Sequence, residues 1–100
     1  MTSKQTLSVE QVQQFLRNHP EWALDDGMLV RFWTFSDFLE AMAFVNRVAG
    51  VAENAGHHPD IDIRYNRVRL ALVSHDAGGI TARDVAMATQ LGADAAAPPA

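Results

Sequence analysis

The sequence predicts a single α+β domain with the element order α-β-β-α-β-β-α, in which helices pack on one face of a four-stranded antiparallel sheet. Two observations indicate this class: three segments place apolar residues at helical spacing, and two pairs of β-rich segments lie between them, each joined by a short turn. With 100 residues, 48% of them hydrophobic, the chain can form one compact core and leaves no room for a second domain. We expect this domain to span residues 1–94 and the Ala/Pro-rich residues 95–100 to form a disordered tail.

The first helix is expected at residues 9–17. Ser8 suits the N-cap position, and Gln11 three residues later completes the pattern of a capping box. Pro20 cannot continue a helix, so it marks the end of this one. The apolar residues at helical spacing are Val9, Val12, Phe15 and Leu16.

The first hairpin follows directly. Residues 21–24 are typical of a short strand, residues 25–27 (Asp-Asp-Gly) of a turn, and residues 28–35 of a second strand rich in β-forming side chains. Alternation in the second strand places Val30 and Phe32 on one face. The opposite face carries Leu29, Arg31, Trp33 and Phe35.

A long helix is expected next, with Ser36 as its N-cap and Gly56 at its end. One continuous apolar stripe supports it, which indicates a helix that packs along its length against the sheet. The residues of this stripe are Phe38, Ala41, Met42, Val45, Val48, Ala49 and Ala52.

The second hairpin comprises a half-buried strand at residues 61–65, a turn at residues 66–67 and a strand at residues 68–74. Gly78 and Gly79 then interrupt the extended chain.

The last helix is indicated by Thr81 and Asp84, which have the spacing of a second capping box. Gly92 is a suitable C-terminal stop. The inward-facing residues are expected to be Val85, Ala88 and Leu91.

Charge and composition exclude several classes of function. The formal net charge is -4 and the basic residues are scattered, so nucleic acid is not expected as a direct partner. Arg64, Arg67 and Arg69 form a short basic cluster, but alternation along a strand or an intervening turn would divide them between two faces. We therefore expect a solvated edge there.

The chain contains no cysteine, which excludes disulfides and thiolate chemistry and removes the best ligand of structural zinc sites. No apolar stretch approaches the roughly 20 residues needed to span a bilayer, and the first residues lead into no signal-peptide core. We expect a cytoplasmic protein without membrane contact.

The residues best suited to chemistry are three histidines, His57, His58 and His75, each placed just after a regular element. Functional groups gather in loops at the ends of rigid elements, and histidine changes its charge near neutral pH, so two or three together can supply both an acid and a base. A histidine is also often structural, and spacing alone leaves both interpretations open. His19, between a helix end and Pro20, is expected to be structural.

Two other kinds of site are disfavoured. A metal site is not expected, because adjacent histidines point different ways and no third ligand lies at a suitable spacing. A nucleophile at Ser74, with His75 as base and Asp84 as orienting group, is not expected because neighbours in a strand face opposite ways and no nucleophile-elbow motif is present. Trp22 could belong to the core or border a pocket. Glu53 lies one helical turn before His57 and could hydrogen-bond to its ring.

Three stretches carry a resemblance to a known family: residues 52–60 (AENAGHHPD), 65–68 (YNRV) and 74–84 (SHDAGGITARD). With these motifs at these separations, and with Trp22 and residues 32–35 upstream, nearly the whole chain resembles the pterin-4a-carbinolamine dehydratases.

The resemblance implies a lyase that dehydrates 4a-hydroxytetrahydropterin to the quinonoid dihydropterin, the step that recycles tetrahydrobiopterin for aromatic amino acid hydroxylases. It carries the family's catalytic histidines onto His57, His58 and His75 and requires no metal or other cofactor. The residues that it implies contact or surround the substrate are Trp22, Glu53, Pro59, Ser74 and Asp84.

As a hypothesis, His57 and His58 form the acid-base pair, His75 positions or polarises the substrate, and Asp84 orients His75 or its loop. Two positions depart from the family pattern. Ile61 stands where some members have an aromatic residue of the pocket wall, and Gly56 stands where others carry an acid.

The resemblance also implies a homodimer or homotetramer joined through sheet edges and the long helix. Phe38, Met42 and Phe44 are expected to give that helix more apolar surface than one protomer covers. The alternative function is a non-catalytic binding module that acts as a dimerisation cofactor or assembly factor for another protein. An aromatic amino acid hydroxylase is a further expected partner.

Overall fold

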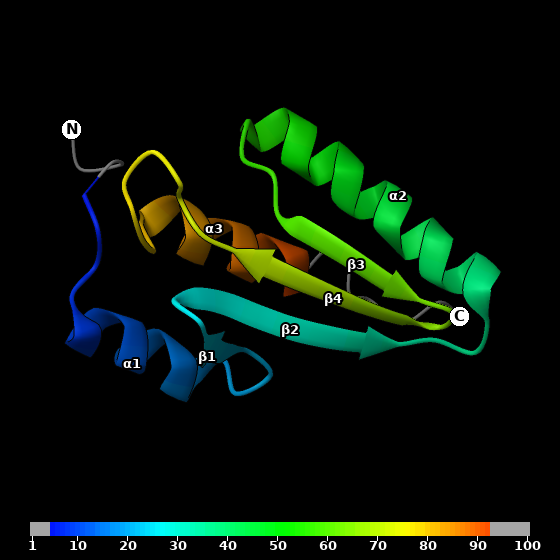
Figure 1. Ribbon diagram of the computed structural model, residues 1–100, viewed down its shortest axis with the longest axis horizontal. Helices are drawn as coiled ribbons and strands as arrows, with labels where there is room; N and C mark the ends of the chain where they lie inside the picture. The colour runs from blue at the N-terminus through cyan, green and yellow to red at the C-terminus, as the bar shows by residue number, and fades with distance from the viewer. Residues whose placement is uncertain (1–4, 93–100) are drawn as a thin grey trace.

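The computed structural model describes residues 5–92 and has the predicted order of elements (Figure 1). The expected tail at residues 95–100 and the end of the domain at residue 94 lie outside the described residues. The elements are α1 (Val9–Asn18), β1 (Ala23–Asp25), β2 (Met28–Thr34), α2 (Phe38–Ala55), β3 (Asp60–Arg64), β4 (Arg67–Leu72) and α3 (Ala82–Gln90).

The four strands form one antiparallel sheet in the order β1-β2-β4-β3. The register pairs Leu29 with Leu72 and Trp33 with Val68, so these four side chains lie on the same face. The core combines them with residues of all three helices, which therefore pack on that face. The predicted α+β class is confirmed. The largest fully buried side chains of the core are Phe44, Leu29, Leu70, Leu72, Met87 and Leu91.

Both predicted capping boxes are present. Ser8 and Gln11 exchange hydrogen bonds at the start of α1, and Thr81 and Asp84 do so at the start of α3. These caps are local, because each joins residues three apart, which is why the sequence reveals them.

The N-cap of α2 differs from the expectation. Asp37 rather than Ser36 is the cap, since its Oδ1 accepts the backbone N–H of Glu40 at 2.9 Å. Ser36 instead donates its hydroxyl to Glu40 Oε1 at 2.6 Å. Adjacent Ser and Asp are both good caps, and a one-residue choice between them depends on backbone geometry that the sequence does not show.

Strand boundaries also shift by one or two residues. β1 begins at Ala23 rather than at residue 21, and β4 runs over Arg67–Leu72, with Ser74 paired separately to Gly79. The turn of the second hairpin is formed by Tyr65 and Asn66, and Tyr65 has a φ of +54°.

The exposed apolar residues of α2 differ from the predicted set. Phe44 is fully buried within the protomer, so it does not contribute to a surplus surface. The exposed large side chains of this helix are Phe38, 46% exposed, and Leu39, 77% exposed. Within residues 5–92 no helix is both long enough and apolar enough to cross a membrane.

Candidate active site

Asp84 is the centre of a buried hydrogen-bond network at the start of α3. Its carboxylate is fully buried, and Oδ2 accepts the backbone N–H of Thr81 at 2.9 Å and the hydroxyl of Ser74 at 2.8 Å. Because the single proton of Ser74 points to Asp84, the hydroxyl of Thr81 must donate to Ser74 Oγ, 2.8 Å away. Ser74 and Thr81 are themselves buried, so every polar group of this cluster is satisfied inside the protein.

The second oxygen of Asp84 holds His57. The distance from Asp84 Oδ1 to His57 Nε2 is 2.6 Å, and the His57 side chain is 11% exposed. An ionised carboxylate only accepts hydrogen bonds, so the proton of this contact belongs to Nε2. In the neutral form of His57 the lone pair then lies on Nδ1, the ring nitrogen that does not contact Asp84.

His58 is paired with Glu53 rather than with a buried group. Its Nε2 lies 2.6 Å from Glu53 Oε2, and the two side chains are 59% and 77% exposed. The expectation that Glu53 binds His57 is therefore wrong. Gly56 explains why Glu53 contacts His58 instead of His57. This residue ends α2 in the left-handed conformation, with a φ of +64°, and so changes the direction of the chain before the two histidines. His57 then contacts α3, and His58 contacts the last turns of α2.

His75 opens a tight loop that is anchored to the same network. The backbone N–H groups of Ala77 and Gly78 both donate to the carbonyl of Ser74 at 3.0 Å. Arg83 Nη2 donates to Asp76 Oδ1 at 2.7 Å, and this hydrogen bond raises the pKa of Arg83. Through Ser74, Asp84 therefore fixes the base of the loop, while it contacts His57 directly.

The antiparallel pairing of β3 and β4 brings the histidines to one end of the sheet. Asp60, at the start of β3, pairs with Ala71, near the end of β4. The segment before β3 and the loop after β4 consequently lie at the same end of the sheet, opposite the β3–β4 turn (Figure 1). His57 and His58 come from the first of these segments and His75 from the second.

A cavity of about 160 Å³ opens beside His57, between the end of α2 and α3. His58 and His75 lie outside its lining. The lining residues are Ala55, His57, Arg83, Ala86, Met87 and Gln90.

The remaining predicted substrate-binding residues are mostly enclosed. Trp22 is 4% exposed and belongs to the core, where its ring meets Trp33 edge-on at 5.9 Å between centroids. Pro59, which follows His58 and precedes β3 in the chain, is also buried. With Ser74 and Asp84 also buried, Glu53 is the exposed member of this group.

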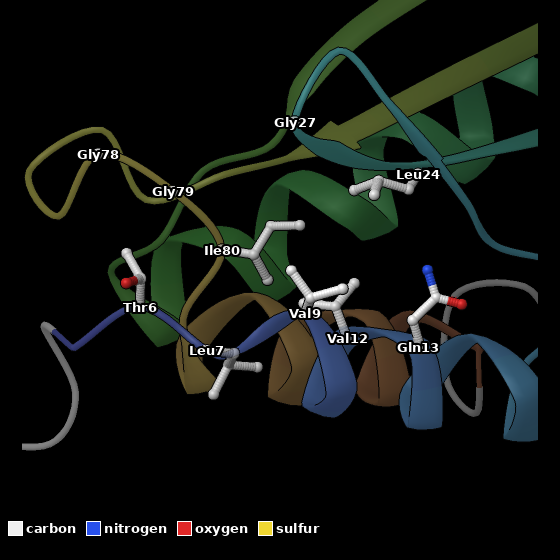
Figure 2. Close-up of a pocket in the computed structure, with 10 residues that line it drawn as sticks. All are labelled: Thr6, Leu7, Val9, Val12, Gln13, Leu24, Gly27, Gly78, Gly79 and Ile80. Atoms are coloured by element: carbon white, nitrogen blue, oxygen red, sulfur yellow. The ribbon is translucent and has the colours of Figure 1, made fainter.

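A larger hollow of about 260 Å³ lies between α1, the β1–β2 turn and the Gly78–Gly79 segment (Figure 2). No side chain of its lining exchanges protons near neutral pH, so it is less suited to acid-base chemistry than the His57 site. Its lining residues are Thr6, Leu7, Val9, Val12, Gln13, Leu24, Gly27, Gly78, Gly79 and Ile80.

Sequence reasoning missed three residues of the site: Thr81 as part of the Asp84 network, and Arg83 and Asp76 as the ion pair on the His75 loop. The capping box did mark Thr81, but only as a cap. Nothing in the spacing showed that the cap carboxylate also binds a histidine 27 residues away. Within residues 5–92 no cluster of three or more His, Asp or Glu side chains is arranged to hold a metal.

Comparison with known proteins identifies the family of the chain. Residues 5–93 match the family model described as Pterin 4 alpha carbinolamine dehydratase. A protein of Acidobacterium capsulatum, provisionally named a pterin-4-alpha-carbinolamine dehydratase, is 56% identical over 85 residues, which are 85% of this chain and 92% of that protein. A protein of Thermomicrobium roseum with the same provisional name is 56% identical over 80 residues, covering 80% of this chain and 86% of the relative.

Solved structures share the fold. The crystal structure of a transcriptional coactivator/pterin dehydratase from Brucella melitensis superimposes with a TM-score of 0.85 and 32% identity, over 92% of this chain and 99% of that one. A pterin dehydratase-like RuBisCO assembly factor of the α-carboxysome has a TM-score of 0.61 at 23% identity, over 78% and 89% of the two chains, and shows the fold alone. The chain belongs to the pterin 4 alpha carbinolamine dehydratase family.

Proposed function

We propose that this chain is a lyase that dehydrates 4a-hydroxytetrahydropterin to the quinonoid dihydropterin, in the recycling of tetrahydrobiopterin. The observation that carries the proposal is the His57–Asp84 pair, in which a buried carboxylate orients a nearly buried imidazole beside a cavity. Family membership supplies the pterin substrate class.

The reaction needs one proton delivered and one removed. A proton reaches the 4a-hydroxyl, the bond between C4a and that oxygen breaks, and water leaves. The N5 proton is removed, and its electron pair forms the double bond between N5 and C4a. Because one proton is given and one taken, an acid and a base of similar strength near neutral pH suffice, and imidazoles meet this requirement.

His57 and His58 are the proposed acid-base pair. Each has its Nε2 engaged with a carboxylate, of Asp84 and Glu53 respectively, so each ring offers Nδ1 to the substrate. His75, on its anchored loop at the same end of the sheet, is proposed to position or polarise the pterin.

Replacement of the histidines tests the proposal. In a stopped-flow dehydration assay, His57→Ala should lower the rate on the order of 10²- to 10⁴-fold, the range typical of a general acid-base group. His75→Ala should lower it on the order of 10²- to 10³-fold, the range typical of a lost polarising donor. His19→Gln is the matched control, because His19 stacks on Phe15 of α1 at 4.3 Å between ring centroids and takes no part in the site. If His57→Ala or His75→Ala retained the wild-type rate, the mechanism would have to be abandoned.

A second candidate function is a partner-binding module, and the exposed Phe38 and Leu39 of α2 favour it. The Brucella relative, described as a transcriptional coactivator as well as a pterin dehydratase, points the same way. Self-association into a dimer or tetramer and contact with an aromatic amino acid hydroxylase are the proposed associations. Recovery of a stoichiometric partner together with the absence of dehydratase activity would favour the module over the enzyme.

A further inference from the structure

The face of the sheet opposite the helices carries a third hollow, which the proposed function does not use. All three helices contribute to the core on the other face, so no described helix covers this one. The hollow has a volume of about 170 Å³. Its lining consists of one aromatic ring, one carboxylate and three guanidinium groups, from Phe32, Asp62, Arg64, Arg67 and Arg69.

Strand register gathers the three arginines. Arg64 of β3 lies directly opposite Arg67 of β4, and Arg69 lies between Phe32 and Asp62 in the next row that faces the same way. The expectation that alternation would divide these arginines between two faces is therefore wrong. Like charges placed directly opposite one another destabilise a sheet, so an anion bound between Arg64 and Arg67 would relieve their repulsion.

The existing carboxylates compensate this charge only in part. Arg64 Nε lies 3.1 Å from Asp62, and Arg69 Nη2 lies 3.4 Å from Asp25. Arg64 and Asp62 are 81% and 46% exposed, and exposed ion pairs of this kind are weak. Arg67 stacks over the Phe32 ring at 5.3 Å and makes no ion pair within residues 5–92.

Phe32 lies outside the cluster of buried core residues. It is 52% exposed in the central strand β2, whereas its neighbours Val30 and Trp33 are buried. An exposed aromatic ring beneath a guanidinium group provides a flat apolar surface next to a positive charge.

We propose that this hollow binds a single oxyanion group, a phosphate or a carboxylate carried by a small molecule. The oxyanion lies between the guanidinium groups of Arg64 and Arg67, which can donate paired N–H groups to its oxygens, and the adjoining part of the ligand rests on Phe32. Asp25 and Asp62 flank the arginines, and their charges repel a longer polyanion such as nucleic acid.

This site is distinct from the His57 site and independent of the proposed dehydratase activity. It lies on the strands beside the β3–β4 turn, whereas the histidines lie beyond the opposite ends of β3 and β4. Arg64, at the end of β3, lies about 13 Å along the strand from Asp60 at its start, at about 3.3 Å per residue.

The test is an NMR titration of the ¹⁵N-labelled full-length protein with inorganic phosphate, acetate and benzoate, at ionic strength held constant with sodium chloride. We expect saturable shifts of the Arg67 side-chain N–H and of the backbone amides of residues 64–69. Saturation by phosphate alone identifies a phosphate site, and saturation by acetate and benzoate identifies a carboxylate site. If a carboxylate binds, the wild-type protein should bind benzoate more tightly than acetate, because the benzoate ring would rest on Phe32. The Phe32→Leu variant should lose this preference.

Variants decide whether the shifts report the proposed site. Arg67→Gln should weaken the binding of the saturating anion by about tenfold or more, the loss typical of a charge-assisted contact. Arg17→Gln, an exposed change on α1, should leave it unaltered. The proposal is overturned if none of the three anions gives saturable shifts, or if Arg64→Gln/Arg67→Gln binds as the wild type does. It is equally overturned if a ten-residue oligothymidylate binds this face more tightly than each anion.

Discussion

At the scale of single residues, the decisive feature is that one buried carboxylate serves two elements at once. Asp84 caps α3 through the backbone of Thr81 and holds the ring of His57. Each carboxylate oxygen has its own partners: Oδ2 accepts hydrogen bonds from Ser74 and Thr81, and Oδ1 contacts the imidazole of His57. Any change at this position therefore alters both the start of a helix and the tautomer of a candidate catalytic histidine.

Asp84→Asn should reverse that tautomer. The amide oxygen can keep the hydrogen bonds of Ser74 and Thr81, so the NH₂ group must face His57 and donate to Nε2, which moves the ring proton to Nδ1. We expect the dehydration rate to fall on the order of 10²- to 10⁴-fold, as for other histidines held in the wrong tautomer.

Stopped-flow kinetics measure that rate, and ¹⁵N shifts of the imidazole report the tautomer. Asp26→Asn, in an exposed turn, removes the same charge and should leave both unchanged. An Asp84→Asn protein with the normal tautomer and an unchanged rate would contradict the assigned role.

Ser74→Ala should destabilise the protein through the same network. It removes a donor to Asp84 and leaves the buried hydroxyl of Thr81 without its acceptor, which costs about 1–3 kcal/mol in the free energy of unfolding. Urea denaturation measures the loss. Ser36→Ala, an exposed serine, is the matched control, and an equal effect of the two changes would show that the buried network contributes little.

At the scale of elements, local rules placed all seven helices and strands of the described chain in the right order. Capping residues, glycines and side-chain alternation act over two to four positions, so a single sequence displays them. The errors lie at the ends of elements, such as the cap of α2 and the start of β1, where neighbouring residues compete for the same role.

The cap of α2 provides an element-scale prediction. Asp37→Ala should lower the free energy of unfolding by about 1 kcal/mol, because it leaves a backbone N–H at the helix start without its acceptor. Ser36→Ala, which removes only an exposed side-chain contact, should cost less. Urea denaturation of the two variants measures their free energies of unfolding. If Ser36→Ala lost more stability than Asp37→Ala, Ser36 would be the N-cap of α2.

At the scale of the whole molecule, the outer surface of α2 is the best candidate for association between chains. Leu39 is 77% exposed and Phe38 46% exposed, and we propose that these neighbouring apolar side chains form part of an interaction surface.

Leu39→Glu should weaken the proposed self-association, because a charge would replace an apolar side chain at the proposed contact. Loss of one buried leucine corresponds to a dissociation constant higher on the order of tenfold or more. Sedimentation velocity over a range of concentrations measures this change. Val9→Glu, at a 73% exposed position of α1, is the control, and the surface is misassigned if both variants associate as the wild type does.

The sequence by itself determined the class of the fold, the order of its elements and the motifs that mark the family. Their place just after regular elements made His57, His58 and His75 candidates for chemistry, and the family resemblance assigned them and Asp84 to the site. The sequence did not reveal which carboxylate would meet which histidine.

Only the tertiary structure decided that Glu53 pairs with His58, that Asp84 pairs with His57, and that Arg64 and Arg67 face each other on an open sheet. These contacts depend on the left-handed turn at Gly56 and on strand register. Packing of the whole core sets that register, since a slip of one residue would send each side chain to the opposite face.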